Sequence, residues 1–332
     1  MRGPPLPWQD LQWQRLRDAH EKGRLAHGLL LTGPHGCGRR RFADALAANL
    51  LCNALDAEPA CGNCRACLQL AAGTHPDHVQ LAPAESGKSI GVEAVRDLVE
   101  RMHLTAGNGT KVAVITPADS LTTSAANSLL KILEEPPQGA YLILISTPNA
   151  RLPATVRSRC QRIAFTLPAR AKALAWLAER GVDNGETWLS RAGGAPLLAE
   201  ELAHADSGRH SAQADPVGEL VAVLARRRSP AGAAAALLAV PLDEVVRAWI
   251  LVIEDLIRLR QVPDAAVRLG SHHDTLISLV RQVDARALFD YLDQLYRSVP
   301  GPSSPLKPAL QIQALLVAAS QIVAHPTKSR GA

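Results

Sequence analysis

Short apolar runs alternate with helical patterns along the first half of the chain. Residues 112–115 form a continuous apolar run with polar and turn residues on either side, as expected of a buried parallel strand, and residues 141–145 are expected to form another. Further strands are predicted at residues 25–32, 79–81 and 162–165. Residues 92–102 carry apolar side chains three and four positions apart, the spacing of one helix face. A further helix is expected from Ser124, its candidate N-cap, to Glu135, because two prolines follow. Strands that alternate with helices predict a parallel, doubly wound α/β sheet.

From residue 168 onward the pattern is helical throughout. A first helical group ends near residue 205, and the polar stretch at 206–215 is expected to be a linker. Longer amphipathic helices are predicted at 242–259, 285–299 and 306–323. We therefore predict three parts: an α/β domain over residues 1–166, a small helical domain over 167–206, and an all-helical domain over 207–332.

A glycine-rich segment, Gly-Pro-His-Gly-Cys-Gly-Arg-Arg, occupies residues 33–40 between the first predicted strand and a predicted helix at 42–51. A working phosphate-binding loop reads G-x-x-x-x-G-K-[ST]; its lysine reaches the phosphates and its hydroxyl holds Mg²⁺. Here the glycines remain, but both working side chains are replaced, so the loop is degenerate. Two readings of the replacing arginines stay open: they hold a phosphate, or they are simply solvated. The residues concerned are Gly33, Gly36, Gly38, Arg39 and Arg40.

A second requirement of a nucleotide motor is also missing. In such motors the strand corresponding to 112–115 ends in an acidic residue that helps to hold Mg²⁺, and an adjacent glutamate positions the attacking water. Thr116 and Pro117 occupy these positions here, and Asp119 lies beyond the end of the strand. Because both catalytic sets are absent together, we expect no ATP hydrolysis by this chain.

Four of the cysteines have the spacing of a metal site. Cys52, Cys61, Cys64 and Cys67 follow the pattern C-x₈-C-x₂-C-x₂-C, and four thiolates suit tetrahedral Zn²⁺. A closed set of four ligands leaves no open coordination position, which predicts a structural role. An iron–sulfur cluster is the alternative, although nothing else in the sequence indicates redox chemistry.

Composition adds limits on location and partners. The chain has 332 residues, of which 47% are hydrophobic and 20% charged, as in soluble globular proteins. It contains no apolar run of about 18 residues, and residues 1–14 contain no apolar signal core, so we expect a cytoplasmic protein. The net charge of +5 is compatible with an anionic partner, whereas only 3% aromatic residues argue against a stacking platform for single-stranded nucleic acid.

Taken together, these motifs resemble the clamp-loader ATPases of DNA replication. The resemblance covers about residues 6–200 and is carried by Ser124-Ala-Ala-Asn-Ser-Leu-Leu-Lys-Ile-Leu-Glu-Glu-Pro-Pro137 and by Ser158-Arg159-Cys160. The cysteine knuckle is shared by the motor subunits and the non-hydrolysing members of the family. The degenerate loop, the missing acidic pair at Thr116 and Pro117, and Ala72-Gly-Thr-His-Pro-Asp77 point to a non-hydrolysing member. The resemblance implies an AAA+ fold: a P-loop-type α/β domain with an inserted zinc knuckle, a small helical lid, and a helical collar that joins the subunits into a five-membered ring.

The resemblance also implies roles for particular residues. Arg159, with Ser158 and Cys160, matches the motif whose arginine enters the ATP site of the neighbouring subunit. An arginine finger supplied in this way is worth about 10³–10⁵ in rate in GTPases. Pro196 occupies the position of a nucleotide-sensing lid arginine, and the loop glycines would be kept for close backbone packing. The chain would then be a stator that joins motor subunits and a clamp-opening subunit to load the sliding clamp onto primed DNA, with structural zinc and no ATP of its own.

Two other functions stay open. An active clamp-loader motor would require ATP turnover by the isolated chain, and the replaced residues of both catalytic sets argue against it. A free-standing zinc-bearing nucleic-acid module would require DNA binding without partners and a salt dependence that shows several phosphate contacts. The position of the cysteines, inserted within an α/β domain, disfavours this module.

Overall fold

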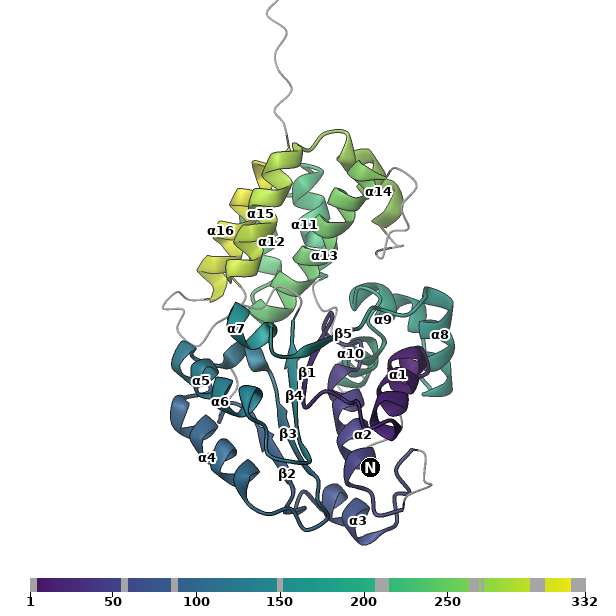
Figure 1. The fold of residues 1–332 in the computed structure, drawn as a ribbon. Coiled ribbons are helices and arrows are strands. Elements are labelled where there is room, and N and C mark those ends of the chain that lie inside the picture. Colours follow the sequence, from purple (N-terminus) through teal and green to yellow (C-terminus); the bar gives the residue numbers. More distant parts are fainter. Residues whose placement is uncertain are drawn as a thin grey trace, which may run out of the picture. The chain divides into compact units, whose positions relative to one another are not determined.

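The computed structural model describes residues 5–54, 59–84, 89–147, 152–206, 215–262, 269, 272–298 and 308–323. The chain divides into two compact units, Met1–Pro168 and Ala169–Ala332 (Figure 1). This division falls two residues after the predicted end of the α/β domain at residue 166. The finer separation of a lid from a collar stays a prediction, and most of its predicted linker, residues 207–214, lies outside the described residues.

The N-terminal unit is built on a five-stranded parallel sheet with the order β2-β3-β4-β1-β5. Both faces of the sheet are covered, so the central strands are continuous apolar runs. All five predicted strands are confirmed, the first beginning three residues later than expected, at Gly28. The strands are β1 (Gly28–Thr32), β2 (His78–Leu81), β3 (Lys111–Ile115), β4 (Ala140–Ser146) and β5 (Gln161–Ala164).

Helices cover the two faces of this sheet, with α1, α2 and α3 against one face and α4 to α7 against the other (Figure 1). Alternate residues of a strand serve the two cores: Leu29 and Leu31 of β1 pack with α1 and α2, whereas Leu30 packs with α4 to α7. Burying each such side chain contributes about 1.5–3 kcal/mol. The helical segments are η1 (Pro7–Gln9), α1 (Asp10–Glu21), α2 (Arg39–Leu51), α3 (Arg65–Ala72), α4 (Val92–His103), η2 (Ala118–Ser120), α5 (Thr123–Ser128), α6 (Leu130–Glu134) and α7 (Ala154–Arg157).

Two helix starts differ from the sequence-based expectation. The helix expected at 42–51 begins at Arg39, because Gly38 adopts a left-handed φ of +92° and turns the chain directly into the helix. The N-cap of α5 is Thr122 and not Ser124, since the Thr122 hydroxyl accepts a hydrogen bond from the backbone N–H of Ala125 at 3.2 Å. The helix expected to run from there to Glu135 is divided at Leu129 into α5 and α6.

The C-terminal unit is helical in its described residues. The core of its later helices surrounds Trp249, which is fully buried and donates its indole N–H to the carbonyl of Pro216 at 2.8 Å. The helices predicted at 242–259, 285–299 and 306–323 correspond to α13, α15 and α16; residues 299 and 306–307 lie outside the described part. The helices are α8 (Arg170–Glu179), α9 (Gly185–Arg191), α10 (Pro196–Asp206), α11 (Pro216–Leu224), α12 (Pro230–Ala236), α13 (Leu242–Gln261), α14 (His273–Val280), α15 (Ala285–Ser298) and α16 (Pro308–Ser320).

The predicted fold class is therefore confirmed: a parallel α/β unit, with the cysteine knuckle inserted between α2 and β2, is followed by helices. Among the described residues, no helix is both long enough and apolar enough to cross a bilayer.

Candidate functional sites in the N-terminal unit

The backbone of the degenerate phosphate loop lies tightly against its surroundings. A Cβ atom on Gly33 would lie 2.7 Å from the carbonyl oxygen of Phe165, closer than van der Waals contact permits. A Cβ atom on Gly38 would overlap the side chain of Leu6 and lie 2.9 Å from the amide nitrogen of Gln9. Gly36 and Gly38 also have positive φ angles of 72° and 92°. Close packing accounts for Gly33 and Gly38, and the positive φ angle accounts for Gly36.

The N-terminal segment of the chain covers the loop. Leu6 and Gln9 are fully buried, and the side-chain amide of Gln9 donates to the carbonyl of Cys37 at 3.2 Å. The indole N–H of Trp8 donates to the same carbonyl at 3.0 Å, while the carboxamide oxygen of Gln9 accepts from the backbone N–H of Leu6 at 2.9 Å. The loop is thus fastened to residues 6–9 by side chains that no sequence motif singles out.

Arg39, which replaces the phosphate-binding lysine, is buried, with only 8% of its surface exposed. Its guanidinium donates to the carbonyl of Ser146 at the end of β4. Burial lowers the pKa of Arg39, and the nearby Cys37 and Asp119 oppose that shift. The Asp119 carboxylate in turn accepts from the backbone N–H and hydroxyl of Thr147 at 3.0 and 2.8 Å. The solvated alternative is therefore wrong for Arg39, whose charge is directed into the protein.

Arg40 behaves differently, although it is the next residue. Its side chain is 44% exposed and contacts Asp44 one turn along α2 at 3.2 Å. It also donates to the side-chain carbonyl of Gln80 at 3.0 Å. Arg40 is therefore a solvent-facing residue whose pair with Asp44 is worth at most a few tenths of a kcal/mol.

The end of β3 offers no carboxylate at the positions where a motor would need one. Thr116 donates its backbone N–H to the carbonyl of Leu81 at 2.9 Å, and the exposed Pro117 leads into η2. Asp119 follows on η2, where its carboxylate is engaged by Thr147. Neither Thr116 nor Pro117 can act as a metal ligand of the required charge.

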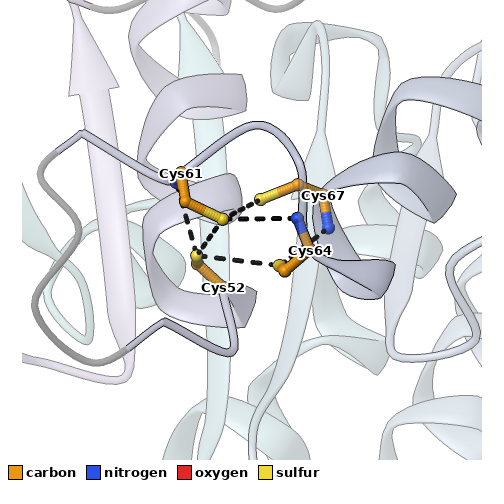
Figure 2. Close-up of side chains that lie close together, drawn as sticks. All are labelled: Cys52, Cys61, Cys64 and Cys67. Carbon is orange, nitrogen blue, oxygen red and sulfur yellow. Dashed lines mark hydrogen bonds between the residues drawn. The ribbon is translucent and has the colours of Figure 1, made fainter.

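The four predicted cysteines converge on one point (Figure 2). Their sulfur atoms all lie within 4.8 Å of one another. Individual pairs are 3.6 Å apart for Cys52 and Cys61, 3.9 Å for Cys52 and Cys64, and 3.9 Å for Cys61 and Cys67. Thiolates bound at about 2.3 Å around zinc form a tetrahedron with edges of about 3.8 Å. The spacing fits one ion; a cluster with several irons needs its thiolates farther apart, because each binds a different iron.

Local backbone structure explains how the cysteine site forms. Cys52 ends α2, and Cys64 is the N-cap of α3, where its sulfur accepts from the N–H of Cys67 at 3.5 Å. The backbone N–H groups of Asn63 and Cys64 lower the pKa of Cys61. Burial opposes ionisation of Cys64, but backbone N–H groups outweigh it and bring its pKa to about 6.

Cys67 shows the opposite shift, since burial raises its pKa to about 12. The protein's own hydrogen bonds thus stabilise part of the thiolate charge, and four thiolates together require a cation. The donor set fits Zn²⁺ held by Cys52, Cys61, Cys64 and Cys67.

The Ser-Arg-Cys motif forms an exposed corner between α7 and β5. The Ser158 hydroxyl donates to the carbonyl of Thr155 at 3.0 Å, and the guanidinium of Arg159 donates to the same carbonyl at 3.0 Å. Arg159 also forms an ion pair with Glu134 at 2.6 Å, a contact that sequence spacing did not reveal. Cys160 is half-buried against the core, and burial raises its pKa to about 11.

Comparison with known proteins shows which families the region around these sites resembles. Residues 8–168 match the family described as "DNA polymerase III, delta subunit". DNA polymerase III subunit delta' of Pseudomonas aeruginosa is 45% identical over 201 residues, which are 59% of this chain and 60% of that protein. The Escherichia coli protein of the same name is 39% identical over 173 residues, 52% of each chain. The matches to these curated relatives thus span about half to three fifths of their length.

Other matches are more distant. DNA polymerase III subunit tau of Bacillus subtilis is 32% identical over 151 residues, 45% of this chain and 26% of that protein. A solved Thermotoga maritima protein related to the DNA polymerase III gamma subunit has a TM-score of 0.44 at 17% identity, over 92% of this chain and 99% of that one. The family match and the delta' relatives agree: the N-terminal unit resembles the DNA polymerase III delta-subunit family, and the chain is similar to the delta' subunits of bacterial DNA polymerase III.

Proposed function

We propose that this chain is a non-hydrolysing stator subunit of the DNA polymerase III clamp loader in the cytoplasm. It assembles with motor subunits of the gamma and tau type and with a delta subunit into a five-membered ring. The ring loads the sliding clamp onto primed DNA. The observation that carries the proposal is the combination, in a delta'-like unit, of a phosphate loop closed by the chain itself with an exposed arginine in the Ser-Arg-Cys motif.

The loop geometry supports the absence of hydrolysis. The arginine in the lysine position donates to a carbonyl of its own chain, and buried Leu6 and Gln9 pack on the loop. No hydroxyl follows at position 40 to hold Mg²⁺, and Thr116 and Pro117 provide no carboxylate. Pro196, which opens α10, likewise lacks the charge of a nucleotide-sensing arginine.

The exposed corner supports a role in a neighbouring ATP site. The Arg159 side chain is 37% exposed, and a planar, permanently charged guanidinium suits the charge that develops on a transferred phosphoryl group. Zinc would stabilise the knuckle structurally, because four cysteine ligands leave no position for a substrate. The net charge of +5 is compatible with contacts to the phosphate backbone of DNA.

The test is ATP hydrolysis by the reconstituted ring in the presence of primed DNA and clamp. Arg159→Ala should lower turnover about tenfold with assembly intact, because one site loses its transition-state cation. Arg157→Ala, which removes another exposed arginine on the same short segment, should leave turnover within about twofold of the parent. Equal turnover of the parent and Arg159→Ala would refute the arginine-finger role.

An active motor subunit is the second candidate, favoured by the similarity to a tau subunit. It predicts ATP turnover by the purified chain, whereas the stator predicts none above the background of a mock purification. Turnover that rises in proportion to the concentration of the chain and is lost in Arg39→Ala would favour the motor.

A further inference from the structure

The side chain of Glu134 pairs with Arg159 from a helix outside the Ser-Arg-Cys motif. Glu134 is the last residue of α6, and its carboxylate oxygen lies 2.6 Å from an Nη atom of Arg159. The two side chains are 49% and 37% exposed, so they pair at the surface. Glu134 lies 25 positions before Arg159 in the sequence, and only the fold brings them together.

The other Nη atom of Arg159 is fixed by α7. It donates to the carbonyl of Thr155 at 3.0 Å and lies 3.5 Å from the hydroxyl of Ser158. The helices that provide these contacts are anchored in one core, since Leu133 is 2% exposed and Val156 is fully buried there. The guanidinium is therefore held by contacts from α6 and α7, and both helices pack into the same close-packed core.

These contacts leave part of the Arg159 guanidinium available to another group. A guanidinium has five N–H donors, and three are engaged by Glu134, Thr155 and Ser158, which leaves two for a phosphoryl group. An unrestrained arginine side chain loses rotamer freedom when it is fixed. A side chain already held in one arrangement loses less of that freedom on docking.

We propose that Glu134 is a positioning residue: its carboxylate orients the Arg159 guanidinium for insertion into the neighbouring subunit's ATP site. This inference rests on the proposed function. Because the pair is exposed, its contribution is a few-fold effect on rate. We expect the change in kcat and not in KM. An arginine that acts on developing charge stabilises the transition state more than it stabilises bound ATP.

The experiment compares Glu134→Gln with its neighbour Glu135→Gln in the reconstituted ring with primed DNA and clamp. Glu135 is the exposed C-cap of α6 and provides a matched control. Glu134→Gln should lower kcat about twofold to fivefold with KM changed by less than about twofold. Glu135→Gln should match the parent, and Glu134→Asp, which keeps the charge, should recover at least half of the lost kcat.

A double-mutant cycle separates positioning from general structural damage. Glu134→Gln should have no further effect on kcat in an Arg159→Ala background, because the group through which it acts is gone. An undiminished loss in that background, or a rise in kcat of Glu134→Gln alone, overturns the positioning role. If Arg159→Ala itself leaves turnover unchanged, the proposed function fails and this inference fails with it; if Arg159→Ala lowers turnover but Glu134→Gln does not, only the inference fails.

Discussion

The loop at residues 33–40 and the corner at residues 158–160 each place an arginine at the end of a helix, but the two arginines face opposite ways. Arg39 is 8% exposed and donates to a backbone carbonyl within the sheet. The Arg159 side chain is 37% exposed and is held by a surface carboxylate. Arg39 stands where a nucleotide site needs a lysine and is engaged by a contact within the chain, whereas Arg159 presents its charge at the surface.

The difference shows how the same residue type acquires different roles from its surroundings. A buried guanidinium must be hydrogen-bonded by the protein and so becomes part of the fold. An exposed one contributes little to stability, and its remaining N–H groups can contact another molecule. Variants at the two places should therefore divide between loss of stability and loss of function.

The largest loss of stability is expected at the four-cysteine knuckle. It follows the C-terminal end of α2, and the phosphate loop precedes the N-terminal end of the same helix. Cys64→Ser should release zinc and unfold the segment around residues 52–72, because zinc contributes about 10 kcal/mol to the folding of small zinc sites. Metal content and hydrogen exchange of that segment are the measurements, and the exchange of residues 216–298 should not change.

Cys160→Ser is the matched control, because Cys160 lies outside the four-cysteine cluster and should keep one zinc per chain. A Cys64→Ser protein with full zinc content and unchanged exchange would show that the cluster is not a zinc site. It would also show that α2 needs no metal at its C-terminal end to keep the phosphate loop at its N-terminal end in place.

A smaller loss of stability is expected when a side chain is added at Gly38. Gly38→Ala should lower the free energy of unfolding by about 3 kcal/mol, because it combines a positive φ with overlap against Leu6 and Gln9. Gly23→Ala should cost only about 1 kcal/mol, since Gly23 has a φ of +61° but nothing within 4 Å of its Cβ position. Urea denaturation measures both free energies of unfolding. Equal losses for Gly38→Ala and Gly23→Ala would mean that residues 6–9 do not pack on the loop.

The smallest effects compare the two arginines directly. Arg39→Ala should lower the free energy of unfolding by about 2 kcal/mol, because the Ser146 carbonyl loses its charged donor. Arg159→Ala should change it by less than about 0.5 kcal/mol. Chemical denaturation of the isolated chain measures both values, and a larger loss for Arg159→Ala would reverse the assignment of inward and outward roles.

Local sequence signals were enough to predict several features of the N-terminal unit. Apolar runs predicted β3 and β4, because a strand buried on both faces requires them. The short strand β5 is mostly exposed and was predicted without such a run. The spacing of Cys52, Cys61, Cys64 and Cys67 predicted their convergence, because a short knuckle leaves the chain few ways to separate the thiols. The replacement of the lysine at position 39 was likewise visible without a structure.

Tertiary structure decided what the two arginines do. The sequence left Arg39 open between phosphate binding and solvation, and neither reading included its partner Ser146, which lies 107 positions away. The cover formed by Leu6 and Gln9 and the pair between Glu134 and Arg159 are also contacts between distant segments. Such contacts depend on how the sheet brings strand ends and helix ends together, and no local periodicity encodes that arrangement.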